Sequence, residues 1–278
     1  MSGRLSVVAT PIGNLEDITY RAVRVLGEVD LIAAEDTRSA RKLLGRYGVR
    51  KETVSVFAGN EARRTEELLT RLVAGDHVAL ISESGTPGVS DPGERLIRRC
   101  IDAGIEVDVV PGPSAVTTAL VLSGLPAARF TFLGFLPRAG GRRREVLEQL
   151  RFEPGTLVLY ESPRRVHQTL QDLLATLGER EAALARELTK RHQEVVREPL
   201  SALVARFKEQ PARGEVTLVI GPGREDDALP GEALDREILA RLGRGESPAQ
   251  ISQALRFHGK RAVYQRALRL RDRGEPTP

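Results

Sequence analysis

The sequence has few of the residues on which disulfide-bonded, metal-binding and membrane proteins depend. Its 278 residues include one cysteine, Cys100, one methionine and no tryptophan. A single cysteine excludes a disulfide framework and a thiolate metal site, and the four histidines show no ligand spacing, so we expect no resident metal. No apolar run approaches the roughly 20 residues of a membrane span, and residues 1–10 lack a signal-peptide pattern. We therefore expect a soluble cytoplasmic protein that does not enter a membrane.

Lysine is scarce as well. Five of the 42 cationic side chains are lysines, so the other 37 are arginines. The planar guanidinium binds phosphate better than an ammonium because it can donate two hydrogen bonds at once. A bias in nucleotide composition that favours arginine over lysine explains the total equally well. Because the net charge is only +4, any site for a polyanion must be a local cluster.

The common nucleotide-binding signatures are also missing. No G-x-G-x-x-G follows the first expected strand, and no G-x-x-x-x-G-K-S/T occurs anywhere. A Rossmann dinucleotide site is therefore not supported, and a P-loop is excluded.

The chain does contain short apolar runs that alternate with helix-like stretches. This alternation predicts a parallel sheet with helices on both faces. The strands expected in the first half are 5–9, 29–34, 54–57, 77–81 and 105–110. After the break at Pro111–Pro113, a second series is expected at 130–135, 156–160, 182–186 and 216–220.

Three regions follow from this pattern. We expect an α/β domain at 1–113, a second α/β domain at 114–222 and a small helical C-terminal domain at 231–273, with a linker of Gly, Pro and acidic residues before the last. In the tail, Ser247-Pro248 has the pattern of a helix start, and Gly259 is expected to separate the last two helices.

Three loops rich in glycine, proline and small polar residues follow three of the expected strands. They are Thr10–Asn14, Ser82–Gly93 and Pro111–Ala115. Taken alone, the residues of each loop are those of an ordinary turn. Ligands of parallel sheets, however, bind beyond the carboxyl ends of the strands. Together the loops indicate one ligand with an adenosine-like body and a carboxylate.

These loops, with the motifs at 34–38, 160–163 and 185–190, carry a resemblance. The sequence resembles the tetrapyrrole methylase superfamily over residues 4–222, and within it a subgroup that methylates the ribose 2′-hydroxyl of a cytidine in 16S rRNA. The resemblance implies a parallel-sheet N-terminal domain, a mixed-sheet second domain and the small helical C-terminal domain. It also implies S-adenosylmethionine (SAM) as cofactor between the two α/β domains, 16S rRNA or the small ribosomal subunit as substrate, and a homodimer.

The resemblance also assigns cofactor contacts by position. They are Pro11, Gly85, Thr86, Pro87 and Val89, then Ser114 and Ala115 from the loop after strand 105–110, and Tyr160, Leu188 and Thr217 from the second domain. The subgroup usually has Ser-Asp-Ala-Gly-Thr-Pro where this chain has Ser82-Glu83-Ser84-Gly85-Thr86-Pro87. The longer acid puts a specific role for that carboxylate in doubt and leaves the role of the glycine unchanged.

Methyl transfer from a sulfonium to a hydroxyl needs alignment and benefits from a base that removes the hydroxyl proton. The candidates, in order of preference, are Glu161, Glu187, Lys190 and Asp36. Structural roles are equally compatible with the sequence. Asp36 has the position of a helix cap, and Glu187 has Arg164 or Arg165 as possible partners.

Two groups of cations are candidates for contact with RNA phosphates. They are Arg138, Arg142, Arg143 and Arg144 in a Gly-Arg stretch, and Lys260, Arg261 and Arg266 in the helical tail. For the tail, a solvated helix face is an equal alternative. Aromatic residues make up only 4% of the chain, and Phe132, Phe135 and Tyr160 are the candidates for holding an extruded base, with a core position as the alternative for Phe132.

Two other functions remain open on the sequence. One is a SAM-dependent methylase of a tetrapyrrole or another small molecule. The other is a non-catalytic RNA-binding factor for ribosome assembly that has kept the loops of a cofactor site.

Overall fold

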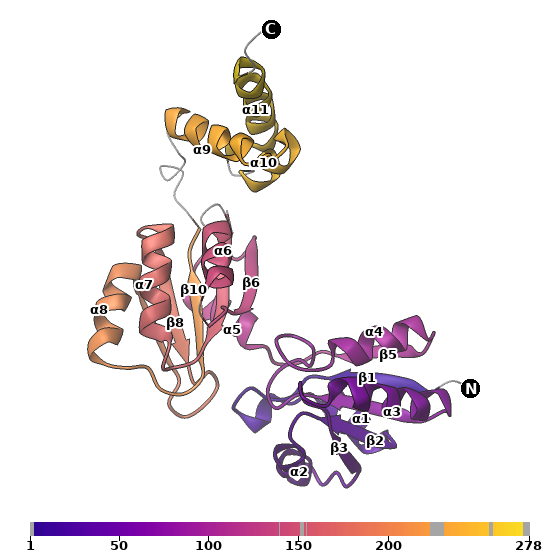
Figure 1. Ribbon diagram of the computed structural model, residues 1–278. Helices are drawn as coiled ribbons and strands as arrows, with labels where there is room; N and C mark the ends of the chain where they lie inside the picture. The colour runs from indigo at the N-terminus through magenta and orange to yellow at the C-terminus, as the bar shows by residue number, and fades with distance from the viewer. Residues whose placement is uncertain are drawn as a thin grey trace. The chain divides into compact units, whose positions relative to one another are not determined.

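The computed structural model describes residues 3–138, 140–150, 153, 155–222, 231–255 and 258–274, with backbone alone at 231–233 and 273–274. The chain forms two compact units, which are described separately (Figure 1). Within the described residues, no helix is both long and apolar enough to cross a membrane.

The first unit contains a five-stranded parallel sheet with the strand order β3-β2-β4-β1-β5. The strands are β1 (Arg4–Val8), β2 (Leu31–Ala34), β3 (Glu52–Ser55), β4 (His77–Ile81) and β5 (Glu106–Val110). The predicted parallel sheet is confirmed, and the predicted strand ends differ by at most two residues.

Helices cover both faces of this sheet because successive strand residues point to opposite sides. On β4, for example, Val78 and Leu80 pack with α3 (Glu61–Val73) and α4 (Glu94–Asp102), whereas Ala79 and Ile81 pack with α1 (Tyr20–Glu28) and α2 (Thr37–Arg46). Cys100 is buried on the α4 side, where burial raises the pKa of its thiol to about 11. It is a packing residue of this core.

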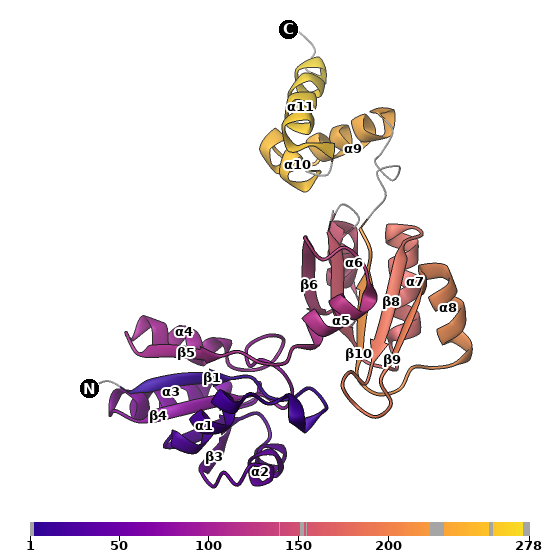
Figure 2. The ribbon, with the colours of Figure 1, turned by 180° about the vertical axis from the view of Figure 1, so that it is seen from behind.

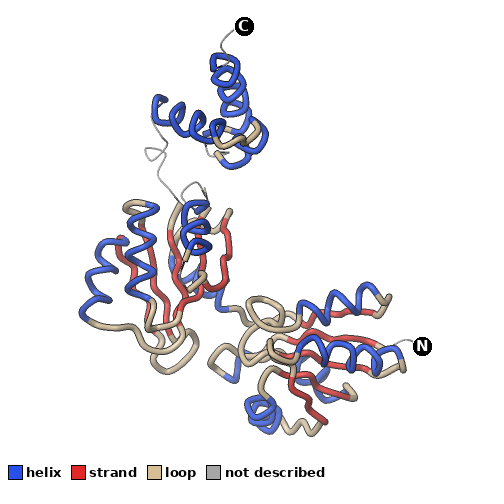
Figure 3. The backbone as a smooth tube through the Cα atoms, in the orientation of Figure 1, coloured by secondary structure: helices blue, strands red, loops and turns tan. Residues whose placement is uncertain are grey.

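The topology brings three predicted loops to one edge. Since β4, β1 and β5 are neighbours and parallel, their carboxyl ends lie together, and the loops that follow them lie at the same end of the sheet (Figure 3). In an open α/β sheet this edge, where the strand order reverses, is the usual place for a ligand.

The second unit contains a mixed sheet with the order β6-β7-β10-β8-β9. The strands are β6 (Phe130–Phe135), β7 (Thr156–Glu161), β8 (Glu181–Arg186), β9 (Glu194–Pro199) and β10 (Val216–Ile220). Strand β10 is antiparallel to both β7 and β8, so β6, β7 and β8 end at the same edge. Helices α6 (Gly141–Leu150), α7 (Val166–Leu177) and α8 (Leu200–Glu209) lie on one face (Figure 2).

Two elements of this unit are absent from the sequence prediction. Strand β9 is an edge strand in which only Val196 is buried, so its apolar signal is weak. Helix α8 has a detectable signal, since Leu200, Leu203 and Phe207 recur at helical spacing and are buried. Helix α5 (Ala115–Ser123) is likewise absent from the prediction. It is apolar on almost all sides, so its sequence shows no helical periodicity.

The domain boundary differs from the predicted division at 113/114. The first unit continues to Ala119 and also includes Glu187–Glu194, the connection between β8 and β9. This segment belongs to the first unit because it contacts the loop after β1. The Asn14 N–H donates a hydrogen bond to Thr189 Oγ1 at 2.9 Å. The predicted domain bounds 1–113, 114–222 and 231–273 stay predictions beside this grouping of contacts.

The helical tail has a core of its own. Its helices are α9 (Gly231–Gly243), α10 (Pro248–Ala254) and α11 (Lys260–Gly274), and six of their residues form a separate buried cluster: Leu234, Ile238, Ile251, Leu255, Val263 and Ala267. Ser247 and Gln250 form the predicted capping box, and Gly259 precedes α11 with φ +84°. The predicted linker lies mostly outside the described residues.

Candidate active site

The three loops at the carboxyl edge of the first sheet contact one another. Thr10 and Gly85 exchange backbone hydrogen bonds of 2.8 and 3.1 Å. Gly85 has φ +81°, and a side chain there would lie 3.6 Å from Ile12 and 3.8 Å from the carbonyl oxygen of Pro113. The glycine thus serves both a left-handed backbone conformation and close approach of the other two loops. Pro11 and Pro87 are buried beside it, whereas Val89 is exposed.

The connection Glu187–Glu194 packs on the same edge. A Cβ at Gly13 would lie 2.6 Å from Lys190 Cγ and 2.7 Å from both the Leu188 carbonyl and Thr189 Oγ1, so the connection rests directly on this glycine. Within it, the Lys190 ammonium and the Glu187 carboxylate form an ion pair of 3.0 Å, and both side chains are partly exposed. The pairing of Glu187 with Arg164 or Arg165 stays a prediction beside this ion pair.

This connection also holds strained backbone. Glu187 and Thr189 have φ of +50° and +62°, and they are two of the three non-glycine residues with positive φ in the described chain. Such conformations cost on the order of 1–3 kcal/mol each and concentrate at functional sites. Leu188, which lies between them, is buried.

Carboxyl groups that the sequence analysis did not single out lie at the ends of β2 and β4. The pKa of Glu35 is raised by burial and by the nearby charges of Asp91 and Glu83, against a hydrogen bond from the Glu83 backbone N–H. Burial also raises the pKa of Asp91, which accepts a hydrogen bond from Ser82. The signal that could have identified Glu35 is its position directly after a buried strand.

In the second sheet, Tyr160 and Thr217 are register partners on β7 and β10. Phe135 is the register partner of Tyr160 on β6. The rings of Phe132 and Phe135 lie 5.0 and 5.6 Å from that of Tyr160. Residues three apart on a strand normally face opposite sides. Here a bulge between them, with Gly134 at φ +61°, turns both rings toward Tyr160.

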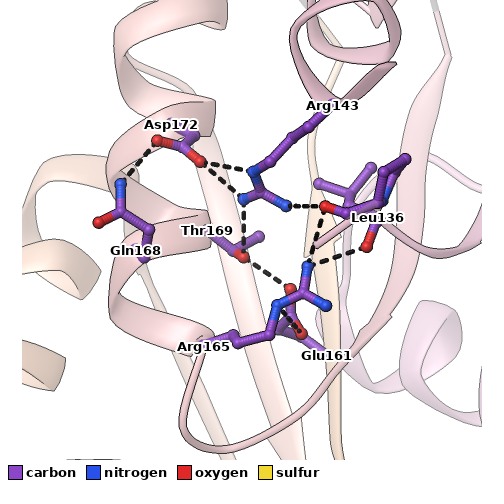
Figure 4. A network of polar contacts seen from close by, with 8 residues as sticks. Leu136, Arg143, Glu161, Arg165, Gln168, Thr169 and Asp172 are labelled. Carbon is purple, nitrogen blue, oxygen red and sulfur yellow. Dashed lines mark hydrogen bonds and ion pairs between the residues drawn. The ribbon is translucent and has the colours of Figure 1, made fainter. Parts of the chain in front are cut away.

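Glu161, the preferred base candidate, lies inside the second unit. Its side chain is 0% exposed and forms an ion pair with Arg165 at 3.3 Å. It accepts hydrogen bonds from the Thr169 hydroxyl at 2.6 Å and from the Ser162 N–H at 2.7 Å (Figure 4). A buried carboxylate with three partners is a structural group, so the prediction that Glu161 acts as a base does not fit its surroundings.

Asp36, the last candidate, has the alternative role that the sequence allowed. It is the N-cap of α2, and its carboxylate accepts a hydrogen bond from the Arg38 N–H at 2.7 Å. Of the four candidates, only Glu187 and Lys190 lie together and partly exposed at the edge formed by the loops. Within the described residues, no group of three or more His, Cys, Asp or Glu could hold a metal ion.

The family model of the tetrapyrrole (corrin/porphyrin) methylases matches residues 4–204, which include both sheets except β10. The chain belongs to the tetrapyrrole methylase family. Two relatives are named ribosomal RNA small subunit methyltransferase I. The protein from Thermotoga maritima is 48% identical over 80% of this chain and 100% of its own length, and that from Escherichia coli O157:H7 is 44% identical over 96% and 95%.

Solved structures of tetrapyrrole methylases and related enzymes share the fold. A diphthine synthase matches with a TM-score of 0.63 at 17% identity, covering 79% of this chain and 90% of its own. A uroporphyrin-III C-methyltransferase from Thermus thermophilus, complexed with S-adenosylhomocysteine, matches with a TM-score of 0.58 at 24% identity, covering 79% and 97%. At this identity the likeness concerns the fold alone.

The cationic candidates of this tetrapyrrole methylase differ in exposure. Arg138, Arg142 and Arg144 are exposed, but Arg143 is only 8% exposed and pairs with Asp172 at 2.7 Å. The prediction that Arg143 contacts phosphate is therefore not supported by its position. In the tail, Lys260 and Arg261 are exposed, whereas Arg266 is half-buried and donates to Asp235 at 2.8 Å. Arg256, another cation of the tail, lies outside the described residues.

Proposed function

We propose that this protein is a SAM-dependent rRNA methyltransferase that methylates the 2′-hydroxyl of a cytidine ribose in 16S rRNA of the small ribosomal subunit. The observation that carries the proposal is the extent of the likeness to ribosomal RNA small subunit methyltransferase I, which is 48% identical over the whole length of one relative. The convergence of three loops at one sheet edge provides a place for the cofactor.

The residues at this edge fit SAM in two respects. Helix α5 begins at Ala115, directly after the loop that follows β5, and the backbone N–H groups of a helix start suit a carboxylate. The half-buried carboxyl groups of Glu35 and Asp91 suit a cation. Ten residues are proposed to contact the cofactor: Pro11, Gly85, Thr86, Pro87, Val89, Ser114, Ala115 and Leu188 from the first unit, and Tyr160 and Thr217 from the second. All ten contacts stay predictions from the resemblance.

When bound, SAM supplies a methyl group already activated on a sulfonium. The chain must align the ribose oxygen and receive its proton. We assign the proton to the Glu187–Lys190 pair, since these are the only base candidates that are partly exposed beside the loop after β1. The Glu187 carboxylate would accept the proton of the hydroxyl, and the Lys190 ammonium would orient the hydroxyl oxygen and offset the negative charge that develops on it. A positioned base of this kind contributes about 10²–10⁴ in rate.

The exposed arginines around α6 are proposed to bind RNA phosphates. Arg138, Arg142 and Arg144 make no side-chain hydrogen bond or ion pair among the described residues, so their guanidinium groups are available to a polyanion. Lys260 and Arg261 are a second candidate group. Arg266 has Asp235 as its partner and is better explained as a link between α11 and α9.

A homodimer acting in the cytoplasm, where small subunits are assembled, completes the proposal. The supporting observation is apolar exposure on an otherwise well packed fold, with Val121 of α5 75% exposed. Sedimentation of the purified protein at several concentrations tests this part, and a concentration-independent monomer would contradict it.

The decisive experiment is transfer of labelled methyl from SAM to small subunits that lack the native modification, followed by nuclease digestion and mass spectrometry. We expect label on the ribose of one cytidine. Label on a base would contradict the proposed chemistry. A protein that binds SAM but transfers nothing to subunits or rRNA favours a small-molecule methylase, and a protein that binds rRNA but not SAM favours an assembly factor.

A further inference from the structure

A buried polar network holds the loop that follows β6. Arg143 lies between two exposed arginines on α6 but points inward with Leu147 and Leu150, which follow it at helical spacing. Its guanidinium donates to Asp172 Oδ2 at 2.7 and 2.8 Å and to Thr169 Oγ1 at 3.1 Å. Its third arm, Nη1, donates to the backbone carbonyl of Pro137 at 2.9 Å.

Arg165, which immediately precedes α7, approaches the same loop from the other side (Figure 4). Its Nη2 donates to the carbonyl oxygen of Leu136 at 2.8 Å and to that of Pro137 at 3.3 Å. These carbonyls lie beyond the end of β6, where the sheet no longer provides partners. Two guanidinium groups therefore replace the sheet in fixing this part of the backbone.

The network is electrically balanced and mostly withdrawn from water. Arg143 and Arg165 are offset by Asp172 and Glu161, and the Thr169 hydroxyl joins the two pairs by accepting from Arg143 and donating to Glu161. Removing one member of such a network leaves another charge buried without its partner. The arrangement consequently permits one position of the loop rather than several.

We propose that Arg143 and Arg165 are positioning residues for the RNA substrate, an inference that rests on the proposed function. Phe135 immediately precedes the two held carbonyls, and Arg138, Arg142 and Arg144 follow them within seven residues. By holding the carbonyls of Leu136 and Pro137 on one side and α6 through Arg143 on the other, the network sets the spacing between an exposed aromatic ring and three exposed guanidinium groups. That spacing is what an extruded nucleotide and its flanking phosphates would meet.

The direct test compares Arg165→Met with Arg165→Lys and with Gln168→Ala. Arg165→Met removes the hydrogen bonds from Arg165 to the Leu136 and Pro137 carbonyls, while Arg143 keeps its bond to Pro137 and Glu161 keeps its bonds from Thr169 and Ser162. Gln168 is the matched control, because it is exposed and donates to the same Asp172 at 2.8 Å but does not contact the loop. Each variant is assayed for hydrogen exchange over residues 136–144, for kcat and KM with small subunits, and for SAM affinity.

For Arg165→Met we expect exchange over 136–144 to accelerate about tenfold or more and KM for subunits to rise about five- to tenfold with a smaller change in kcat. SAM affinity stays within about twofold, Arg165→Lys restores part of the KM, and Gln168→Ala matches the wild type. Faster exchange with unchanged KM, or no change in either, would overturn the proposal and leave a purely stabilising network.

Two further measurements keep the test informative. If Arg165→Met does not fold, Arg143→Lys replaces it, since lysine keeps a charge for Asp172 but cannot also reach Pro137. If the wild type binds SAM and does not methylate subunits, the proposed function fails on its own. Loop exchange and binding of a fluorescent small-subunit rRNA fragment then decide the positioning role. Weaker binding by the variant supports that role, and equal binding refutes it.

Discussion

The two sheets use carboxylates at their strand ends in opposite ways. In the first unit, Glu35 and Asp91 follow β2 and β4, remain half-buried and have raised pKa values. In the second, Glu161 ends β7 fully buried, with an arginine, a hydroxyl and a backbone N–H around it. Carboxyl groups after strands of the first sheet are thus titratable, whereas the one that ends β7 is a structural anchor, because Arg165 and Thr169 beside it hold the carboxylate.

The largest expected effect comes from removing either member of the Glu187–Lys190 pair of the first unit. Glu187→Gln or Lys190→Met should lower kcat for methyl transfer by about 10²–10⁴, the usual contribution of a positioned base, with unfolding unchanged. Single-turnover transfer to small subunits measures it. If both variants keep near-normal turnover, alignment alone supports the reaction.

A substitution at Gly13 tests whether the connection after β8 must contact the loop after β1. Gly13→Ala places a methyl group 2.7 Å from the Leu188 carbonyl, so the backbone must move, and we expect kcat to fall at least about tenfold as the Glu187–Lys190 pair is displaced. Gly27→Ala is the control, since α1 leaves open space there. Equal losses in both variants would contradict the explanation.

Glu161 should behave as an anchor. Glu161→Gln weakens the pair with Arg165, and we expect a loss of about 1–3 kcal/mol in the free energy of unfolding, with kcat of the folded protein within about threefold of the wild type. Urea unfolding and turnover on one preparation measure both. A large loss of kcat in a fully stable variant would restore Glu161 as a catalytic candidate.

The tail offers a milder comparison. Since its buried cluster shares no residue with the core of the second sheet, a chain that stops at Pro222 should keep SAM affinity. Its KM for small subunits should rise severalfold, with a shallower dependence of binding on salt, because tail cations are lost. Isothermal titration and a salt series check this, and unchanged affinity at matched salt would rule out RNA contact by the tail.

The smallest effect concerns pH. The pKa of Asp91 is raised in the folded chain, so the folded state holds its proton more tightly and stability falls as pH rises through that pKa. Asp91→Asn should remove this loss and be more stable than the wild type at pH 7 by less than about 1 kcal/mol. The difference should close near pH 4. Melting temperatures across this range test the sign, and a less stable variant at pH 7 would refute it.

Much of the fold is readable from the sequence. Strands β4, β6 and β10 have the predicted bounds, and the caps at Asp36 and Ser247 follow from local side-chain chemistry. These features depend on residues within a few positions of one another, where periodicity and turn preferences act. The convergence of the three loops also follows, since parallel neighbouring strands end at one edge.

The site is less readable because its geometry depends on distant contacts. The run of four arginines in 138–144 does not reveal that one turns inward, since this requires α7 to present Asp172 and Thr169. The sequence also does not reveal that the Glu187–Lys190 segment packs on the loop of Gly13, because this contact joins residues about 175 positions apart. The sequence by itself determined the alternation of elements, the loops and the chemistry available. Only the tertiary structure decided which charges are buried and paired, because desolvation depends on what covers a side chain.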